Sequence, residues 1–309
     1  MVVGRGYGKL LLFGEHAAVY GYPALGMQVP RFLDLHLTPT NGRGWELQGM
    51  DSRSFGLITN AIAAVPGILG RKIPPHSLTI SGNLPMSVGL GSSAAFCTAL
   101  LRATDPERLA KASMPELWKA AHELEHVFHG TPSGIDTGFS LLERPALLYP
   151  NPTGIPSVSS VNLPKGWLVV GAMPRTGSTA ALIAGIKDRR NRDMAGTESL
   201  LERLGSISEE AGRLTGASRI GELGTLACHA HDILSDLSLS TPTMDAALEL
   251  LHENGSAGAK MSGAGGGGAF FGVFEDEAVA RKGGQSLEAW LQANAPLPDG
   301  AFVTVVGIG

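Results

Sequence analysis

Hydrophobic positions in the first third of the chain predict sheet followed by helix. Residues 9–14 form an apolar run that ends at a glycine, as a buried strand does, and residues 33–37 alternate between apolar and polar side chains like a half-exposed strand. Residues 77–80 are a further candidate strand. A loop containing Pro and Gly covers 83–91, and residues 94–102 are good helix formers.

The middle of the chain carries a clear helix start and a clear break. Residues 113–116, Ser-Met-Pro-Glu, form a capping box that predicts a helix running to about residue 129. Residues 144–164 then hold five prolines among several Ser, Asn and Thr residues, a composition typical of a domain junction. We therefore expect one domain over 1–160 and a second over 161–309.

The second half mixes strands and helices. Its pattern predicts strands at 167–170, 269–274 and 302–306, and helices at 180–190, 198–214, 220–237, 244–253 and between the last two strands. Because strands and helices do not alternate strictly, the order favours an α+β fold over a doubly wound parallel sheet. We find no internal repeat and no low-complexity tail.

Charge and cysteine content limit the classes of partner and compartment. The chain has 24 Lys plus Arg against 28 Asp plus Glu, a formal charge of -4, and no basic run. We therefore expect neither nucleic acid nor a membrane surface as a partner. Cys97 and Cys228 are the only cysteines, which excludes a disulfide framework and suits a reducing compartment. The apolar run 10–13 is too short for a signal peptide or membrane span, so we expect a cytoplasmic protein.

A glycine-rich loop at 85–95, Pro-Met-Ser-Val-Gly-Leu-Gly-Ser-Ser-Ala-Ala, runs directly into a predicted helix. Such a loop suits phosphate, because its N–H groups face inward, the helix N-terminus adds partial positive charge, and a Ser can reach a metal ion. A Ser N-cap after a flexible loop explains the same residues equally well. The Walker A pattern is absent, so this is not an ordinary P-loop protein.

Two further patterns point to other chemistry. Gly263-x-Gly265-x-x-Gly268 fits a dinucleotide fingerprint, but a strand-like stretch follows where a helix is needed. His122-Glu-Leu-Glu-His126 fits the zinc-hydrolase pattern His-Glu-x-x-His, yet no third ligand stands at the expected distance. Polar residues on the exposed side of a helix explain the two histidines. A zinc hydrolase remains the alternative from another enzyme class, which bound-metal analysis would decide.

Two carboxylates lie close together in the sequence. Glu125 falls on the predicted helix, and Asp136 falls in a loop over 130–136. One could hold the metal that bridges phosphates, while the other orients or deprotonates an attacking hydroxyl. Taken alone, the segment is also explained by a solvated helix Glu and an Asp in a local turn.

Three ordered segments resemble the signatures of the GHMP kinases, the family of galacto-, homoserine, mevalonate and phosphomevalonate kinases. They are Lys-Leu-Leu-Leu-Phe-Gly-Glu-His-Ala-Ala-Val-Tyr-Gly at 9–21, Gly-Leu-Gly-Ser-Ser-Ala-Ala at 89–95 and Lys-Met-Ser-Gly-Ala-Gly-Gly-Gly-Gly at 260–268. Each glycine loop alone is weak, but three in this order are highly specific. The resemblance implies a two-domain kinase with a ribosomal S5 domain 2-like N-terminal domain, a ferredoxin-like C-terminal domain, and ATP and Mg²⁺ as cofactors.

The resemblance also implies roles for individual residues. Asp136 matches the catalytic carboxylate, and Lys9 matches the lysine that lowers the pKa of the substrate hydroxyl or stabilises the transferring charge. Glu125 and Ser93 match the magnesium ligands. The implied nucleotide-binding residues are Pro85, Ser87, Gly89, Leu90, Gly91, Ser92, Ser93 and Ala94. Those implied around the acceptor are Glu15, His16, Ser133, Thr179 and Ala264, with Ser133 supporting the catalytic loop.

Within the family, the segments at 14–21 and 131–136 are most similar to the branch that phosphorylates the 5-hydroxyl of mevalonate in isoprenoid biosynthesis. The acceptor hydroxyl would then lie in a cleft between the domains near Asp136. A phosphomevalonate or sugar kinase is the alternative within the family, and a sensor that has lost activity is the non-catalytic one. The presence of all four catalytic and metal residues argues against the sensor. Whether the protein forms a homodimer is left open by the sequence.

One position departs from the family pattern. Ala180 follows Ser178-Thr179, where related kinases often carry a basic residue. The departure leaves open which residue pairs with the substrate carboxylate.

Overall fold

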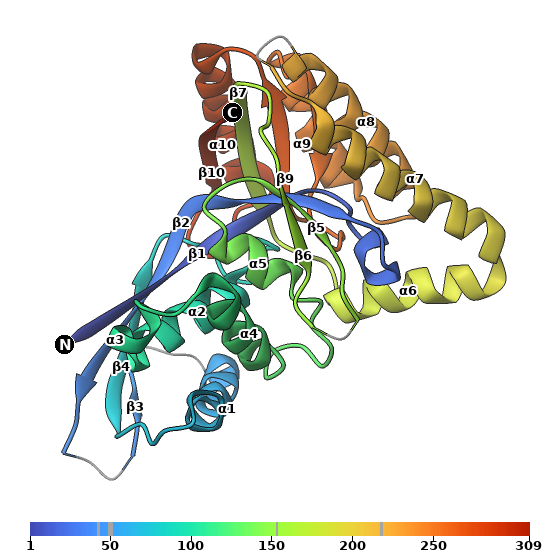
Figure 1. Cartoon of the computed structure of the whole chain (residues 1–309). Helices are drawn as coiled ribbons and strands as arrows, with labels where there is room; N and C mark the ends of the chain where they lie inside the picture. The colour runs from blue at the N-terminus through green and yellow to red at the C-terminus, as the bar shows by residue number, and fades with distance from the viewer. Residues whose placement is uncertain (42–43, 49–51, 153, 217–218) are drawn as a thin grey trace.

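The chain forms two β-sheets with helices packed against them. The computed structural model describes residues 1–41, 44–48, 52–152, 154–216 and 219–309, and Figure 1 shows how the elements are arranged. All strands of the first sheet come from residues 2–160, and all strands of the second come from residues 166–308. The α+β fold expected from the sequence is confirmed. The boundary at 160 and 161 stays a prediction.

The first sheet is built around one long strand, β2. The strands are β1 (Val2–Phe13), β2 (Ala24–Pro39), β3 (Glu46–Leu47), β4 (His76–Gly82), β5 (Ala146–Tyr149) and β6 (Ser157–Ser160). β1 pairs antiparallel with β2 along most of its length. On the other edge of β2, β4 pairs with residues 33–39 and β5 pairs with residues 24–26. The sheet therefore widens at both ends of β2.

A glycine-dependent contact joins this sheet to its helices. The helices of the first half are η1 (Ala17–Tyr20), α1 (Ser52–Leu69), α2 (Ser92–Thr104), α3 (Pro106–Leu109), α4 (Met114–Glu125) and α5 (Ile135–Leu141). α2 packs directly on β1. A Cβ atom on Gly6 would lie 1.8 Å from the carbonyl oxygen of Ala95, and one on Gly4 would lie 2.0 Å from that of Ala99. These N-terminal glycines thus allow a strand and a helix to approach closely.

The predicted capping box is present. The Ser113 N–H donates to the Glu116 carboxylate at 2.8 Å, and the Ser113 hydroxyl does so at 2.7 Å. The helix it begins, α4, ends at Glu125 rather than at residue 129. The N–H of His129 still donates to the carbonyl of Glu125 at 3.0 Å, so the chain continues as one tight turn. Glu125 therefore stands at the end of a helix.

The second sheet is antiparallel, in the order β10-β7-β9-β8. Its strands are β7 (Gly166–Met173), β8 (Gly258–Met261), β9 (Gly268–Phe274) and β10 (Phe302–Ile308). The helices are α6 (Thr179–Arg192), α7 (Met194–Arg213), α8 (Ile220–Asp236), α9 (Pro242–Glu253) and α10 (Glu277–Asn294). α8, α9 and α10 pack against this sheet, and α7 also contacts β1 and β2, so it connects the two halves (Figure 1).

The structure places two segments that the sequence analysis singled out. The proline-rich segment 144–164, the expected domain junction, contains β5 and β6, which pair antiparallel at one edge of the first sheet. Its prolines stand outside these two strands, where a missing N–H costs no ladder hydrogen bond. The glycines at 263–268 connect β8 to β9, so the strand expected after them is confirmed and the strand-to-helix geometry of a dinucleotide fingerprint is absent there. Among the described residues, no helix is long and apolar enough to cross a membrane.

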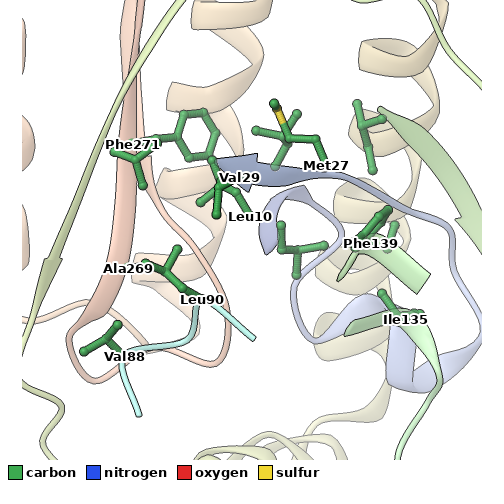
Figure 2. Packing of buried hydrophobic residues seen from close by; sticks show 14 of the residues in the cluster. Leu10, Met27, Val29, Val88, Leu90, Ile135, Phe139, Ala269 and Phe271 are labelled. Atoms are coloured by element: carbon green, nitrogen blue, oxygen red, sulfur yellow. The ribbon is translucent and has the colours of Figure 1, made fainter. Parts of the chain in front are cut away.

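A single hydrophobic cluster contains residues from both sheets. Figure 2 shows Leu10 and Val29 of the first sheet near Phe271 of the second. Val88 and Leu90, from the loop that precedes α2, also lie in this region of the core. The core thus fixes the glycine-rich loop between the two halves of the molecule.

Candidate active site

Lys9 and Asp136 form an ion pair beside the glycine-rich loop. The Nζ atom of Lys9 lies 2.9 Å from Oδ1 of Asp136, and the Lys9 N–H donates to the Leu90 carbonyl at 2.9 Å. The Lys9 side chain is 3% exposed, whereas that of Asp136 is 43% exposed. Asp136 lies in the first turn of α5 and not in a loop as expected, because the helix begins at Ile135 after Gly134. A buried ammonium group therefore holds a carboxylate that solvent and solutes can reach.

The loop residue Gly91 makes room for Lys9. Its φ of +73° favours glycine, and a Cβ atom there would lie 2.6 Å from Cγ of Lys9. Gly91 is also the N-cap of α2, and it offers no side chain to cap the first N–H groups of this 13-residue helix. Free N–H groups at a helix N-terminus suit a phosphate group. The loop therefore places the N-terminus of α2 beside the lysine.

The predicted nucleotide residues divide into two sets. The side chains of Leu90 and Ala94 are buried, so only their main chain can face a nucleotide. Pro85, Gly89, Ser92 and Ser93 are half-buried and Ser87 is exposed, so these residues are accessible. Ser87 has a positive φ of 63°, which is uncommon for a residue with a side chain, and its N–H donates to the Ser92 hydroxyl at 3.4 Å.

Glu125 is a buried carboxylate with a perturbed pKa. Its carboxylate accepts a hydrogen bond from the Thr137 hydroxyl. Burial raises the pKa of Glu125 to about 7, and the negative charge of Asp136 adds to this shift. Hydrogen bonds from Thr137 and Ser93 and the charge of Lys9 oppose it. A cation bound next to Glu125 would favour its ionised form.

The donor set at this place fits Mg²⁺ held together with a nucleotide. Mg²⁺ prefers oxygen ligands and usually takes one or two carboxylates together with substrate phosphates and water. The carboxylate of Glu125 and the hydroxyl of Ser93 supply such oxygens and are close enough to hydrogen bond. Within the described part of the chain, no group of three or more His, Cys, Asp or Glu side chains could hold a metal unaided. A cation here would therefore need phosphate or water oxygens as further ligands.

The same finding argues against the zinc site considered from the sequence. The rings of His122 and His126 lie side by side, with 5.3 Å between their centroids. No third His, Cys, Asp or Glu joins them among the residues that the structure describes. The pattern His-Glu-x-x-His therefore lacks the third protein ligand that a catalytic zinc ion needs.

Two of the predicted acceptor residues meet from opposite ends of the chain. His16 Nε2 lies 3.0 Å from the carbonyl oxygen of Ala264, in the glycine-rich segment between β8 and β9. His16 has a positive φ of 59° and is 7% exposed. Burial lowers the pKa of His16, the hydrogen bond with Ala264 opposes this, and the charge of Arg175 adds to it. At neutral pH His16 is therefore an uncharged hydrogen-bonding group.

Arg175 is a cation of this region that the sequence analysis did not single out. Its guanidinium donates to the Thr179 hydroxyl at 3.0 Å and to the Gly265 carbonyl at 3.4 Å. Its Nε is buried without a partner among the described residues. Burial lowers the pKa of Arg175, and the charge of Asp136 opposes that shift. Arg175 thus contacts the predicted acceptor residue Thr179, which follows it by four positions. Its Nε–H donor has no partner among the described residues.

Glu15 and Ser133, the other two predicted acceptor residues, do not contact the group around His16 and Arg175 in the same way. Glu15 is 1% exposed and forms an ion pair with Lys260, whose ammonium also donates to the Met261 carbonyl at 2.6 Å. This pair joins the end of β1 to β8 instead of presenting a carboxylate to a substrate. The Ser133 hydroxyl accepts a hydrogen bond from the Ile135 N–H at 3.3 Å, beside Asp136. The supporting part expected of Ser133 stays a prediction.

Two groups of side chains therefore lie within electrostatic reach of each other. One group contains the predicted catalytic and metal residues, Lys9, Ser93, Glu125 and Asp136. The other contains His16, Ala264, Thr179 and Arg175. The charge of Asp136 acts on Arg175, which links the two groups. Together they can hold an anionic nucleotide with a cation on one side and a second polar molecule on the other.

Comparison with known proteins adds independent findings. The family profile described as GHMP kinases N terminal domain matches residues 57–144, and that described as GHMP kinases C terminal matches residues 208–292. The chain is similar to the mevalonate kinase of Pyrococcus abyssi, with 27% identity over 88% of each chain. It is also similar to that of Archaeoglobus fulgidus, with 28% identity over 87% of this chain and 91% of the relative.

A solved structure supports the fold. The crystal structure of L. major mevalonate kinase in complex with R-mevalonate superposes with a TM-score of 0.81 and 22% identity. The match covers 100% of this chain and 96% of that chain. Both sheets and the helices around them are therefore arranged as in that protein.

Proposed function

The chain belongs to the GHMP kinase family, and from this premise we propose that it phosphorylates the 5-hydroxyl of mevalonate with ATP. Relatives that carry the name mevalonate kinase align over most of both chains. We propose a cytoplasmic step of isoprenoid biosynthesis, with Mg²⁺ as the metal. The two cysteines without a disulfide, Cys97 and Cys228, suit a reducing compartment.

One observation carries the proposal: the Lys9–Asp136 ion pair lies directly beside the loop that begins α2. Phosphoryl transfer needs alignment of the reacting groups and neutralisation of charge more than covalent help. In the proposed mechanism the half-exposed carboxylate of Asp136 orients the acceptor hydroxyl and takes its proton. The ammonium of Lys9 stabilises negative charge on the hydroxyl oxygen as it attacks.

The other residues hold the reactants in place. The N–H groups at the start of α2 and the loop from Pro85 to Gly91 bind phosphate oxygens. Glu125 and Ser93 would hold the Mg²⁺ ion, which would supply charge neutralisation at the phosphate oxygens when bound. The acceptor then lies between Asp136 and the group around His16, so that its hydroxyl faces the loop.

Arg175 supplies the positive charge that the position of Ala180 lacks. We propose that its guanidinium pairs with the carboxylate of the acceptor, because it lies beside Thr179 and near Asp136 and has an unused buried donor. An arginine fork suits a carboxylate better than a lysine does. This assignment explains how a chain with Ala180 can still bind an acidic acceptor.

Replacing Arg175 with Met should therefore weaken acceptor binding selectively. A hydrogen bond to a charged group contributes about 1.5–3 kcal/mol, so the KM for mevalonate should rise roughly 10- to 150-fold, with the KM for ATP nearly unchanged. Arg175→Lys should recover part of the loss. Arg192→Gln, on the far end of α6, is the matched control and should behave like the wild type. Equal rises in both KM values for Arg175→Met would contradict the assignment.

The substrate is tested by coupled ADP release from Mg-ATP with mevalonate, phosphomevalonate, galactose and homoserine as acceptors. We expect turnover with mevalonate alone. Turnover with another acceptor would keep the family and change the substrate. No turnover with any of them, from a protein that binds ADP, would overturn the proposed activity.

A further inference from the structure

His129 contacts the proposed metal site through both its ring and its main chain. Its Nε2 lies 3.1 Å from the hydroxyl oxygen of Ser93. Its N–H donates to the carbonyl of Glu125 at 3.0 Å. The ring is bound to one proposed metal ligand, and the backbone is bound to the residue that supplies the other. Neither the sequence motifs nor the roles implied by the family resemblance gave His129 a part.

The Ser93 hydroxyl has one proton and two acceptors within reach. Besides His129 Nε2, the carboxylate of Glu125 is close enough to accept from it. If the proton points to Glu125, that carboxylate has less capacity for a cation. If it points to His129, a lone pair of Ser93 Oγ remains for another partner, and Glu125 keeps the acceptor sites that the Thr137 hydroxyl does not use, since a hydroxyl offers one donor and two acceptor sites.

We propose that His129 is a positioning residue, whose Nε2 accepts the Ser93 hydroxyl proton and turns the hydroxyl oxygen toward the divalent cation. This inference rests on the proposed Mg-ATP-dependent function. It requires the neutral ring to carry its own proton on Nδ1, leaving Nε2 as the acceptor. Residues that orient metal ligands in this way typically change metal affinity or activity by about 10- to 100-fold when they are replaced.

The test compares ADP binding with and without Mg²⁺ by calorimetry, which does not depend on turnover. His129→Ala should raise the Mg²⁺ concentration that half-saturates the enhancement of ADP binding by about 10- to 100-fold. Metal-free ADP binding, measured in EDTA, should stay as in the wild type. His129→Gln places an amide oxygen near the position of Nε2 and should restore much of the Mg²⁺ affinity.

His126→Ala is the matched control. His126 lies on the same turn, but its ring faces the Gly130 carbonyl at 3.3 Å instead of Ser93. This variant should keep the wild-type dependence on Mg²⁺. A melting curve for each variant, with His129→Gln as the conservative change, separates loss of fold from loss of positioning.

The outcomes are separable. If the wild type binds ADP more tightly with Mg²⁺ but His129→Ala is unchanged, the inference fails and the proposed function stands. If His129→Ala weakens ADP binding equally with and without Mg²⁺, the residue supports the loop and not the cation, and the inference again fails. If the wild type shows no effect of Mg²⁺ on ADP binding, both fail.

Discussion

Replacing Asp136 with Asn should lower turnover by about 10²- to 10⁴-fold, the usual contribution of a positioned general base. Asn keeps the shape of the side chain but cannot take a proton from the acceptor hydroxyl. The loss should fall on kcat, and the affinity for ADP should stay nearly constant, because the loop before α2 is untouched. Steady-state kinetics with mevalonate and calorimetry with ADP measure the two quantities separately.

The substitution also removes the partner of a buried ammonium group. In the variant, the Lys9 ammonium faces a neutral amide instead of the carboxylate that lies 2.9 Å away in the wild type. Solvent reaches the half-exposed position 136 and compensates for only part of the lost attraction. A modest fall in melting temperature is therefore expected beside the kinetic effect. Asp188→Asn, on the exposed face of α6, is the matched control and should change neither. Normal turnover in Asp136→Asn would remove this carboxylate from the mechanism.

Local sequence signals gave most of the helices because their physical causes are local. The capping box at 113–116 predicted the start of α4, and its hydrogen bonds are in place. α1 was missed since Gly56, Pro66 and Gly67 all disfavour a helix interior. Burial of Ile58 and its apolar neighbours in the core outweighs that local preference.

The glycine clusters show how one residue type serves different purposes. Glycine is typical of close backbone approach and of sharp turns, but it does not identify the approaching partner. Gly4 and Gly6 allow β1 to lie against α2, whereas Gly91 leaves room for the Lys9 side chain. Only the folded arrangement distinguishes helix packing from a ligand-facing loop.

From the sequence, residues of the proposed site that are far apart in the chain could be predicted only where a family motif named them. Lys9 and Asp136 are far apart in the chain, and their 2.9 Å contact follows from the packing of β1, α2 and α5. The resemblance named both residues, yet it could not show that they form a pair. Arg175 was missed because the family pattern places the basic residue after Thr179, although an arginine four residues before Thr179 was a usable signal.

Glu15 is a residue that the resemblance named but whose partner the sequence could not reveal. The resemblance grouped it with the acceptor residues, but a fully buried carboxylate needs a cation, and nothing local reveals that Lys260 supplies it from 245 positions away. Both side chains are 0% exposed. The Lys260 ammonium also lies 5.6 Å from the centroid of the Phe13 ring and 5.4 Å from that of Phe271. The pair therefore ties the first sheet to the second within an apolar surrounding.

The energetics of this pair can be inferred from its surroundings. Burial raises the pKa of Glu15 and lowers the pKa of Lys260, in each case against the attraction between the two charges. The loss of solvation thus outweighs the gain from pairing. Such a pair adds little net stability compared with apolar residues of similar size, but removing one partner leaves an uncompensated buried charge.

Lys260→Met should accordingly destabilise the protein by about 3–5 kcal/mol, and Glu15→Met should do the same, because each leaves its former partner charged or forces it to change protonation in an apolar site. The double variant with Met at both positions should recover most of the loss, since Met fills irregular apolar space without a charge. Denaturant unfolding at neutral pH measures all three. The exposed pair of Glu277 and Arg281 on α10, with 2.6 Å between its closest atoms, is the control cycle and should give only about 0–1 kcal/mol. Additive losses at 15 and 260 would mean that the two charges act independently. The contact between the two sheets would then be stabilised by the surrounding apolar side chains and not by the pairing of these charges.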